Sequence, residues 1–290
     1  MRERTRLLVS PLQRPLQAMA QAGGNAAIEL AWLGQAGFLV RSPKLALAID
    51  PYLSDSLARK YAGTATPHER MMPVPVAPRD LVGLDFVLCT HRHTDHMDPE
   101  TLTAIFSANE TALLVAPRSA RARVREIGVP DARVRYVTAG DVLAPTAELS
   151  IRVIASAHEA IDRDENGDHA YVGYALTLGE LTVYHSGDCV PHEGLAATLS
   201  ETGADLALLP VNGRRPELAA RGIPGNFTPR EAAALCVAAE VPALIAHHFG
   251  MFSFNSADPA AVLAEIRAEA PDLCAFAARP DTVYAFAPNS

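Results

Sequence analysis

The sequence predicts an α+β sandwich, or otherwise an α/β one, in which short strands are interleaved with helices. Nine short apolar runs have the length and composition of buried strands. Helix-start signals lie between some of these runs, and no repeat period is visible. No linker rich in Gly, Pro or Ser separates two self-sufficient halves. We therefore expect residues 1–26 to form an N-terminal tail or extension and residues 27–290 to form a single domain.

The expected strands are short and follow one another along most of the chain. They are Ile28–Leu33, Leu45–Ile49, Leu84–Cys89, Ala112–Val115, Leu149–Ile154, Tyr171–Leu178, Leu181–Tyr184, Leu206–Leu209 and Ala243–Ala246. Helices are expected where an N-cap residue precedes a proline, at Asp98-Pro99, Thr228-Pro229 and Asp258-Pro259. Glu231 adds the spacing of a capping box to the second of these.

Composition and charge limit the kind of partner. The chain is 49% hydrophobic and 20% charged, and no apolar run approaches the roughly 20 residues that a membrane helix needs. Its four cysteines form no C-x-x-C pair, which favours a reducing compartment and hence a cytoplasmic location. The net charge of −8 disfavours extended nucleic-acid binding. We expect a small-molecule substrate and no membrane partner, and leave open a homo-oligomer.

The most informative segment follows the third expected strand. His91, His93, Asp95 and His96 lie within six residues. If the backbone is extended there, the rings of His91 and His93 lean to one side and can share an ion, whereas Asp95 and His96 would point at a second position. Imidazole and carboxylate together suit Zn²⁺, Mn²⁺ or Fe²⁺ better than Ca²⁺ or Mg²⁺. The segment therefore predicts a site for two metal ions.

This segment carries the H-x-H-x-D-H signature, and the chain resembles the metallo-β-lactamase superfamily. Within it, the chain is most similar to the branch that contains L-ascorbate-6-phosphate lactonase. Further matching segments are Trp32–Phe38, Asp50–Asp55, Ser156–Glu159, Tyr184–Cys189 and His247–Phe252. The resemblance implies two packed mixed β-sheets with helices on the outer faces, in the order α-β-β-α.

The resemblance also implies a complete ligand set for two divalent ions, Zn or Mn. His91, His93 and His158 would hold the first ion, and Asp95, His96 and His248 would hold the second. Asp188 would bridge the two ions. Taken alone, His158 is as readily a solvated histidine, and Asp188 is more often a turn residue than a ligand.

Four further residues are candidates for supporting the ligands or contacting the substrate. Asp50 resembles a family residue that orders the first motif through hydrogen bonds, although an ordinary strand-ending Asp is equally expected. His185 and His247 are more simply explained as packed histidines, and His247 cannot face the same centre as its neighbour His248 if the strand stays extended. Arg214 could bind an anionic group of the substrate, but a surface arginine is the simpler interpretation.

These features predict a metal-dependent hydrolase, with Asp95 and Asp188 in catalytic positions. A hydroxide shared by two ions would attack a lactone or ester carbonyl of a small, optionally phosphorylated substrate. One alternative is phosphodiester hydrolysis. A second is a non-catalytic scaffold, which would be expected to have lost ligands, and a third is a single-iron oxygenase. A preference between carbonyl and phosphorus substrates would separate the first two activities.

Overall fold

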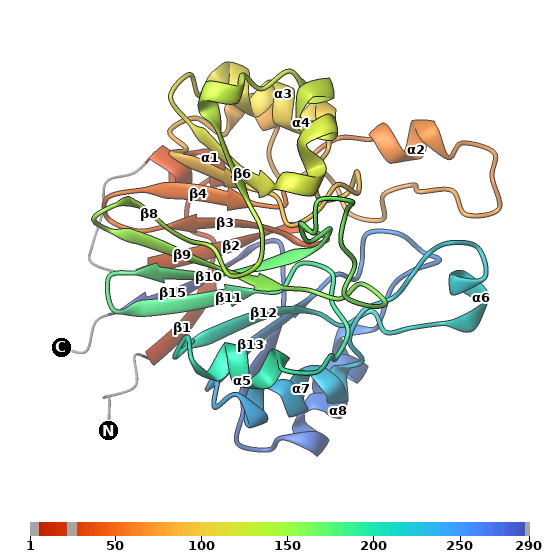
Figure 1. Ribbon diagram of the computed structural model, residues 1–290. Coiled ribbons are helices and arrows are strands. Elements are labelled where there is room, and N and C mark those ends of the chain that lie inside the picture. Colours follow the sequence, from red (N-terminus) through yellow and green to blue (C-terminus); the bar gives the residue numbers. More distant parts are fainter. Residues whose placement is uncertain (1–5, 22–27, 288–290) are drawn as a thin grey trace. The chain divides into compact units, whose positions relative to one another are not determined.

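The computed structural model describes residues 6–21 and 28–287 (Figure 1). The chain divides into two compact units. Unit 1 contains residues 1–137, 251–254 and 279–290, and unit 2 contains residues 138–250 and 255–278. Each unit is built around one mixed β-sheet. This division assigns the early histidine cluster to unit 1 and the three later ligand candidates to unit 2.

The sheet of unit 1 has eight strands in the order β1-β15-β2-β3-β4-β5-β6-β7. Neighbouring strands are antiparallel from β1 to β4 and parallel from β4 to β7. The strands are β1 (Arg6–Pro11), β2 (Ile28–Gly34), β3 (Gly37–Arg41), β4 (Ala46–Ile49), β5 (Phe86–Leu88), β6 (Leu113–Pro117), β7 (Val134–Val137) and β15 (Thr282–Ala287). The parallel half places the carboxyl ends of β4 and β5 at the same edge.

Three helices of unit 1 pack on this sheet through one apolar cluster. They are α1 (Leu16–Gln21), α3 (Pro99–Ala108) and α4 (Arg121–Ile127). Met19 of α1, Ile105 of α3 and Val124 of α4 are fully buried in the same cluster as Leu39 and Val87 of the strands. A fourth helix, α2 (Ser56–Lys60), lies on the long loop between β4 and β5 (Figure 1). The 3₁₀ turns are Pro78–Asp80, Arg118–Ala120 and Asp131–Arg133.

The N-terminal segment, expected to be a tail or extension, contributes ordered elements in its described part. Strand β1 pairs antiparallel with β15, and α1 buries Leu16 and Met19. Residues 1–5 and 22–26 of that segment lie outside the described residues. Pro11 is the last residue of β1 and does not break it, because β1 is the edge strand of the sheet.

The sheet of unit 2 has seven strands in the order β14-β13-β12-β11-β10-β9-β8. Strands β11 to β14 are parallel, and β8 to β11 are antiparallel. The strands are β8 (Val142–Thr146), β9 (Leu149–Ala155), β10 (Val172–Leu178), β11 (Leu181–His185), β12 (Leu206–Pro210), β13 (Ala243–His247) and β14 (Cys274–Ala277). Every residue of β11, β12 and β13 is buried, as expected for central strands of a parallel sheet.

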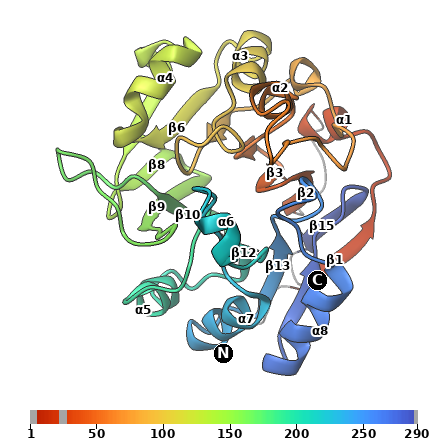
Figure 2. The ribbon, with the colours of Figure 1, turned by 90° about the vertical axis from the view of Figure 1, so that its right-hand side faces the viewer.

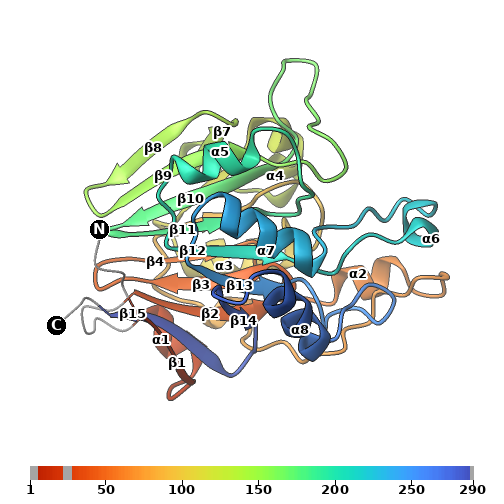
Figure 3. The same ribbon diagram turned by 90° about the horizontal axis from the view of Figure 1, so that it is seen from below.

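The helices of unit 2 are α5 (Leu195–Ser200), α6 (Pro216–Ala219), α7 (Pro229–Ala238) and α8 (Pro259–Glu269). Helices α7 and α8 pack side by side, α7 against β12 and β13 and α8 against β14 (Figures 2 and 3). The predicted N-caps are confirmed: Asp98, Thr228 and Asp258 each accept a backbone N–H of the first turn. Thr228 and Glu231 form the predicted capping box.

All nine predicted strands are confirmed, and the strands that were not predicted are β1, β3, β7, β8, β14 and β15. Strand β8 is largely exposed and contains Pro145, and β14 is a half-buried strand of only four residues. Strand β3 is fully buried and starts immediately after the turn that follows β2. No described helix combines the length and apolar character needed to cross a membrane.

Candidate metal centre

The predicted ligands of each unit, and the supporting residue Asp50, follow the carboxyl ends of strands. In unit 1, Asp50 follows β4, and the segment from His91 to His96 follows β5. In unit 2, His158 follows β9, Asp188 follows β11, and His248 follows β13. Residues just beyond the end of a strand take no part in the hydrogen bonds of the sheet. Their backbone and side-chain groups can therefore contribute to a site.

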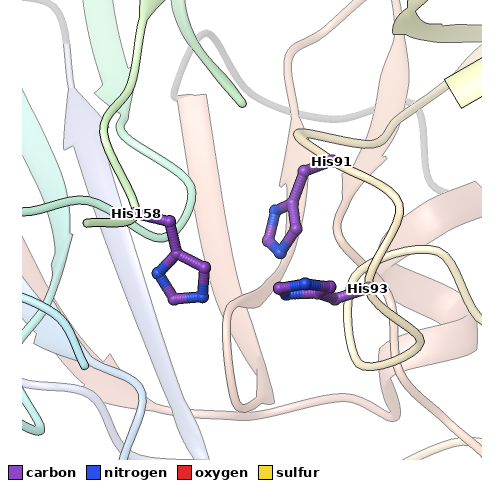
Figure 4. A group of neighbouring side chains, drawn as sticks. All are labelled: His91, His93 and His158. Atoms are coloured by element: carbon purple, nitrogen blue, oxygen red, sulfur yellow. The ribbon is translucent and has the colours of Figure 1, made fainter. Parts of the chain in front are cut away.

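The loop after β5 is bent and not extended as the sequence suggested. His96 N and Met97 N both donate to the carbonyl of His93, at 3.0 and 2.7 Å, which closes a turn before α3 begins. The bend still brings the rings together: the centroids of His91 and His93 are 4.6 Å apart, edge to face (Figure 4). The ring of His96 lies 4.1 Å from that of His91.

A buried carboxylate organises these histidines. Asp50 accepts three hydrogen bonds, from Thr90 N at 2.8 Å, from Thr90 Oγ1 at 2.6 Å and from His96 Nδ1 at 2.7 Å. Asp50, Thr90 and His96 are all fully buried. Three hydrogen bonds offset the cost of burying a carboxylate, and they join the end of β4 to the loop after β5.

The same network selects one imidazole tautomer for His96 and supports the same choice for His91. A carboxylate only accepts hydrogen bonds, so the proton facing Asp50 belongs to His96 Nδ1. The hydroxyl proton of Thr90 is directed to Asp50, so Thr90 Oγ1 can accept from His91 Nδ1, which is 3.1 Å away. In both rings Nε2 then carries the lone pair that a metal ion requires.

Gln35 is a part of this site to which the sequence assigned no role. Its Nε2 donates to Asp95 Oδ2 at 3.0 Å, and its backbone carbonyl accepts from Trp32 Nε1 at 3.0 Å. Gln35 belongs to the segment Trp32–Phe38, whose resemblance to the family was the only available signal. The amide of Gln35 orients the Asp95 carboxylate from the turn between β2 and β3.

In unit 2 one carboxylate lies between two histidines. Asp188 Oδ1 is 3.0 Å from His248 Nε2, and Asp188 Oδ2 is 3.5 Å from His158 Nε2. All three side chains are buried. His158, which is also drawn in Figure 4, has the ring of Tyr171 edge-on at 5.2 Å. Each oxygen of Asp188 therefore faces a different imidazole.

Neighbouring loops hold Asp188 in place. Asn226 Oδ1 accepts from Cys189 N at 2.9 Å, and Asn226 Nδ2 donates to Asn212 Oδ1 at 3.0 Å. Val190 N donates to the carbonyl of Ala157 at 2.7 Å, which ties the Asp188 loop to that of His158. The asparagine side chains therefore support the backbone of the loop.

His185 and His247 are both fully buried, and their rings stack at 5.2 Å. His185 Nδ1 accepts from Gly187 N at 3.0 Å, so its lone pair on that nitrogen serves the turn that leads to Asp188. Burial lowers the pKa of His247 well below its usual value, and the charges of His185 and His248 act in the same direction. The neutral form of His247 is therefore the stable one in the fold.

Arg214, the candidate for anion binding, is engaged in structural contacts. Its guanidinium pairs with Glu231 at the start of α7 and donates to the carbonyl of Asn226 at 3.0 Å. These bonds fix the Asn212–Asn226 loop to the helix. Arg214 therefore already has acceptors from the chain itself.

Three residues of these networks adopt a left-handed backbone. Among the described residues, positive φ outside glycine occurs at Gln35 (49°), Asp50 (43°), Glu240 (58°) and His248 (69°). Glu240 follows Ala239, the C-cap of α7, which is a common place for this conformation. At the other three the cost, about 1 kcal/mol each, is borne by residues whose side chains orient or provide ligand atoms.

The donor set fits a transition metal or zinc. Five imidazoles (His91, His93, His96, His158 and His248) and two carboxylates (Asp95 and Asp188) are buried or half-buried at these strand ends. Nitrogen donors of this number suit Zn²⁺, Mn²⁺ or Fe²⁺, whereas Ca²⁺ and Mg²⁺ prefer oxygen. In each unit, histidine and aspartate side chains therefore form a cluster of metal-ligand type.

Comparison with known proteins agrees with this chemistry. The chain is 29% identical over 248 residues to a metal-dependent hydrolase of Myxococcus xanthus, which covers 82% of this chain and 76% of that protein. A metal-dependent hydrolase of Pyrobaculum islandicum is 25% identical over 235 residues, covering 80% of this chain and 88% of that protein.

Solved structures show the fold. An isothiocyanate hydrolase from Delia radicum gut bacteria aligns with a TM-score of 0.71 at 19% identity, covering 89% of this chain and 99% of that one. A metallo hydrolase of Ignicoccus hospitalis aligns with a TM-score of 0.66 at 17% identity, covering 91% and 100%. The predicted α+β class, with two mixed sheets and helices, is confirmed.

The family itself follows from the sequence match. Residues 47–249 match the model described as the beta-lactamase superfamily domain, which is more than half of the chain. The matched range contains the whole predicted ligand set, from His91 to His248. The chain therefore belongs to the metallo-β-lactamase superfamily.

Proposed function

We propose that this protein is a hydrolase that uses two divalent metal ions, Zn²⁺ or Mn²⁺, to open a lactone or ester of a small substrate. The observation that carries the proposal is the position of Asp188, whose two oxygens face two different histidines. The hydrolase class is also that of the relatives named above. The lactone or ester substrate rests on the resemblance to the ascorbate-6-phosphate lactonase branch, and the size of the substrate on the acidic net charge.

We further propose that residues 27–290 act as a single catalytic domain whose seven predicted ligands hold two divalent ions. His91, His93 and His158 would hold one ion, and Asp95, His96 and His248 would hold the other, with Asp188 shared. Each ion needs about three protein ligands. The predicted set offers seven groups, which is the number needed for three ligands to each ion and one shared ligand.

The chain's own residues prepare the ligands. Asp50 holds the proton of His96 on Nδ1, and Thr90 does the same for His91, so Nε2 of each ring is a donor to metal. Gln35 restrains the Asp95 carboxylate. Such ions, when bound, supply Lewis acidity for a carbonyl oxygen and lower the pKa of water toward about 7. No Ser or Cys nucleophile is then required.

The test is metal content and hydrolysis, measured on wild type and on His93→Ala. Apo-protein reloaded with Zn²⁺ or Mn²⁺ would be assayed with lactones, phosphorylated lactones and phosphodiesters. We expect wild type to cleave carbonyl substrates and the variant to lose both metal and activity. Unchanged metal content and hydrolysis in His93→Ala would refute the proposal. If wild type cleaves phosphodiesters alone, the protein is a phosphodiesterase and not a lactonase or esterase.

A further inference from the structure

Unit 1 contains an aromatic cluster that the ligand set does not use. His68 lies on the loop that returns from α2, between three rings: its centroid is 4.2 Å from Tyr61, 4.9 Å from Phe252 and 4.7 Å from Phe254. The Tyr61 ring is stacked on the imidazole, and the two Phe rings meet it edge to face. We call these four residues the aromatic cluster. Tyr52 and Leu57 form its buried base.

The aromatic cluster lies beside the Asp95 part of the site. A Cβ placed on Gly34 would be 2.8 Å from Met251 Cε and 3.1 Å from Met72 Sδ, so these methionines pack on the turn that carries Gln35. Met71 N donates to the carbonyl of Met251 at 2.8 Å, which joins the α2 loop to the segment that carries Phe252. Because Gln35 donates to Asp95, a series of contacts links the ligand loop to the cluster.

One nitrogen of His68 is a defined acceptor. His68 Nδ1 is 2.8 Å from the carbonyl oxygen of Thr66, and a carbonyl can only accept, so the proton is on Nδ1. In the neutral ring Nε2 then carries a lone pair, and no described residue bonds to it. Burial lowers the pKa of His68 below its usual value of 6.5. The Thr66 carbonyl and the Asp95 carboxylate raise this pKa, but burial has the larger effect, so the ring is neutral at pH 7.

The exposure of the aromatic cluster differs from that of a core. Tyr61, His68 and Phe254 are half-buried, and the adjacent Met71 is 60% exposed. A core position favours a ring without polar atoms, because an unpaired buried acceptor is costly. Half-buried aromatic faces around a neutral acceptor instead match a planar apolar group that carries a hydrogen-bond donor.

We propose that the aromatic cluster binds an aromatic group of the substrate and that His68 Nε2 accepts a hydrogen bond from an O–H or N–H of that group. This inference rests on the proposed function and narrows it to aryl esters or lactones that carry a hydroxyl or amide donor. His68 acts as a specificity residue, and the bond that is cleaved lies on the Asp95 side of the substrate.

Three small probes separate the parts of this proposal: benzyl alcohol, benzyl methyl ether and cyclohexylmethanol. Their dissociation constants would be measured by ligand-observed NMR on the metal-loaded protein. Wild type should bind benzyl alcohol more tightly than both others, by about tenfold over the ether, which is the value of one hydrogen bond. Equal binding of benzyl alcohol and cyclohexylmethanol would overturn the proposal.

Two variants and one control complete the test. His68→Phe keeps a ring but removes the acceptor, so the dissociation constants of benzyl alcohol and benzyl methyl ether should become equal. Phe254→Leu should weaken both aryl probes and preserve their ratio. Tyr136→Leu is the control, because this half-buried ring of unit 1 stacks under Arg121, 4.3 Å away, and takes no part in the aromatic cluster. A preserved preference in His68→Phe would also overturn the proposal.

Hydrolysis assays distinguish failure of the aromatic-cluster proposal from failure of the proposed function. For a hydroxyaryl ester, His68→Phe should raise KM about tenfold and leave kcat and metal content unchanged. If metal-loaded wild type cleaves no ester, lactone or phosphodiester, the proposed function fails, and probe binding still decides on the cluster. If wild type cleaves aryl and cycloalkyl esters equally and binds no probe, the cluster proposal fails and the hydrolase stands.

Discussion

Asp50 and His96 form a fully buried pair in which the carboxylate Oδ2 accepts from the imidazole Nδ1 at 2.7 Å. Asp50 is the first residue after β4, and His96 lies at the end of the loop after β5. The two strands are parallel neighbours, so both residues leave the same edge of the sheet. Because the strand order brings the ends of β4 and β5 together, Asp50 can orient the imidazole of His96.

Replacing Asp50 with Asn should weaken metal binding about 10- to 100-fold, because the imidazole of His96 loses its charged acceptor. Asn tolerates the left-handed backbone found at Asp50, where φ is 43°, so the turn is expected to persist. Competition with a chelator would measure the affinity. Asp85→Asn is the control, since Asp85 accepts from Ala46 N outside the site; equal losses in both variants would contradict a specific role.

Gln35→Leu should lower metal affinity about tenfold by removing the donor to Asp95 Oδ2 without changing side-chain size greatly. Chelator titration monitored by metal release provides the measurement. Gln13→Leu serves as the comparison, because the Gln13 amide is exposed and donates only to Pro11. An affinity identical to wild type would show that Asp95 needs no support from this turn.

Stability should fall in acid partly through Glu231. Burial raises the pKa of Glu231, but hydrogen bonds from Arg214 and Thr228 outweigh it and hold the pKa below 4.5. Because the folded pKa is the lower one, this contribution is present above the unfolded value and is lost as pH falls through the folded value. Glu231→Gln should therefore flatten the decline in unfolding free energy below about pH 4, by under about 1 kcal/mol for this partly exposed pair.

In Arg214→Ala, the decline in unfolding free energy at low pH should begin at a higher pH than in wild type. Urea unfolding at several pH values measures this shift. The variant should leave the KM for anionic substrates unchanged, since the guanidinium of Arg214 is already paired. A large increase in KM for anionic substrates only would instead assign Arg214 to substrate binding.

Gly225→Ala should destabilise the protein by at least about 2 kcal/mol, because the new Cβ would lie 2.1 Å from the carbonyl oxygen of Gly213. Gly222→Ala is the matched variant: its φ is +74° but no atom lies within 4 Å, so about 1 kcal/mol or less is expected. Urea denaturation compares them. Since Asn226 follows Gly225 and supports the Asp188 loop, only Gly225→Ala should also weaken metal binding.

Much of the fold was accessible from the sequence because its signals are local. Continuous apolar runs mark the buried strands, and an N-cap residue before a proline marks α3, α7 and α8. One sequence signal for metal binding is also local, because His91, His93, Asp95 and His96 lie within six residues. The later candidates His158, Asp188 and His248 needed the family resemblance, since a single histidine or aspartate after a strand has no specific signal.

Tertiary structure alone decided how these groups are held. The tautomer of His96 depends on Asp50, which lies 46 residues away in the chain, and the orientation of Asp95 depends on Gln35, which lies 60 away. The aromatic cluster around His68 likewise comes from contacts between distant segments. A sequence window contains the periodicity of one element, whereas a hydrogen bond between two loops exists only once the sheet has brought their ends to one edge.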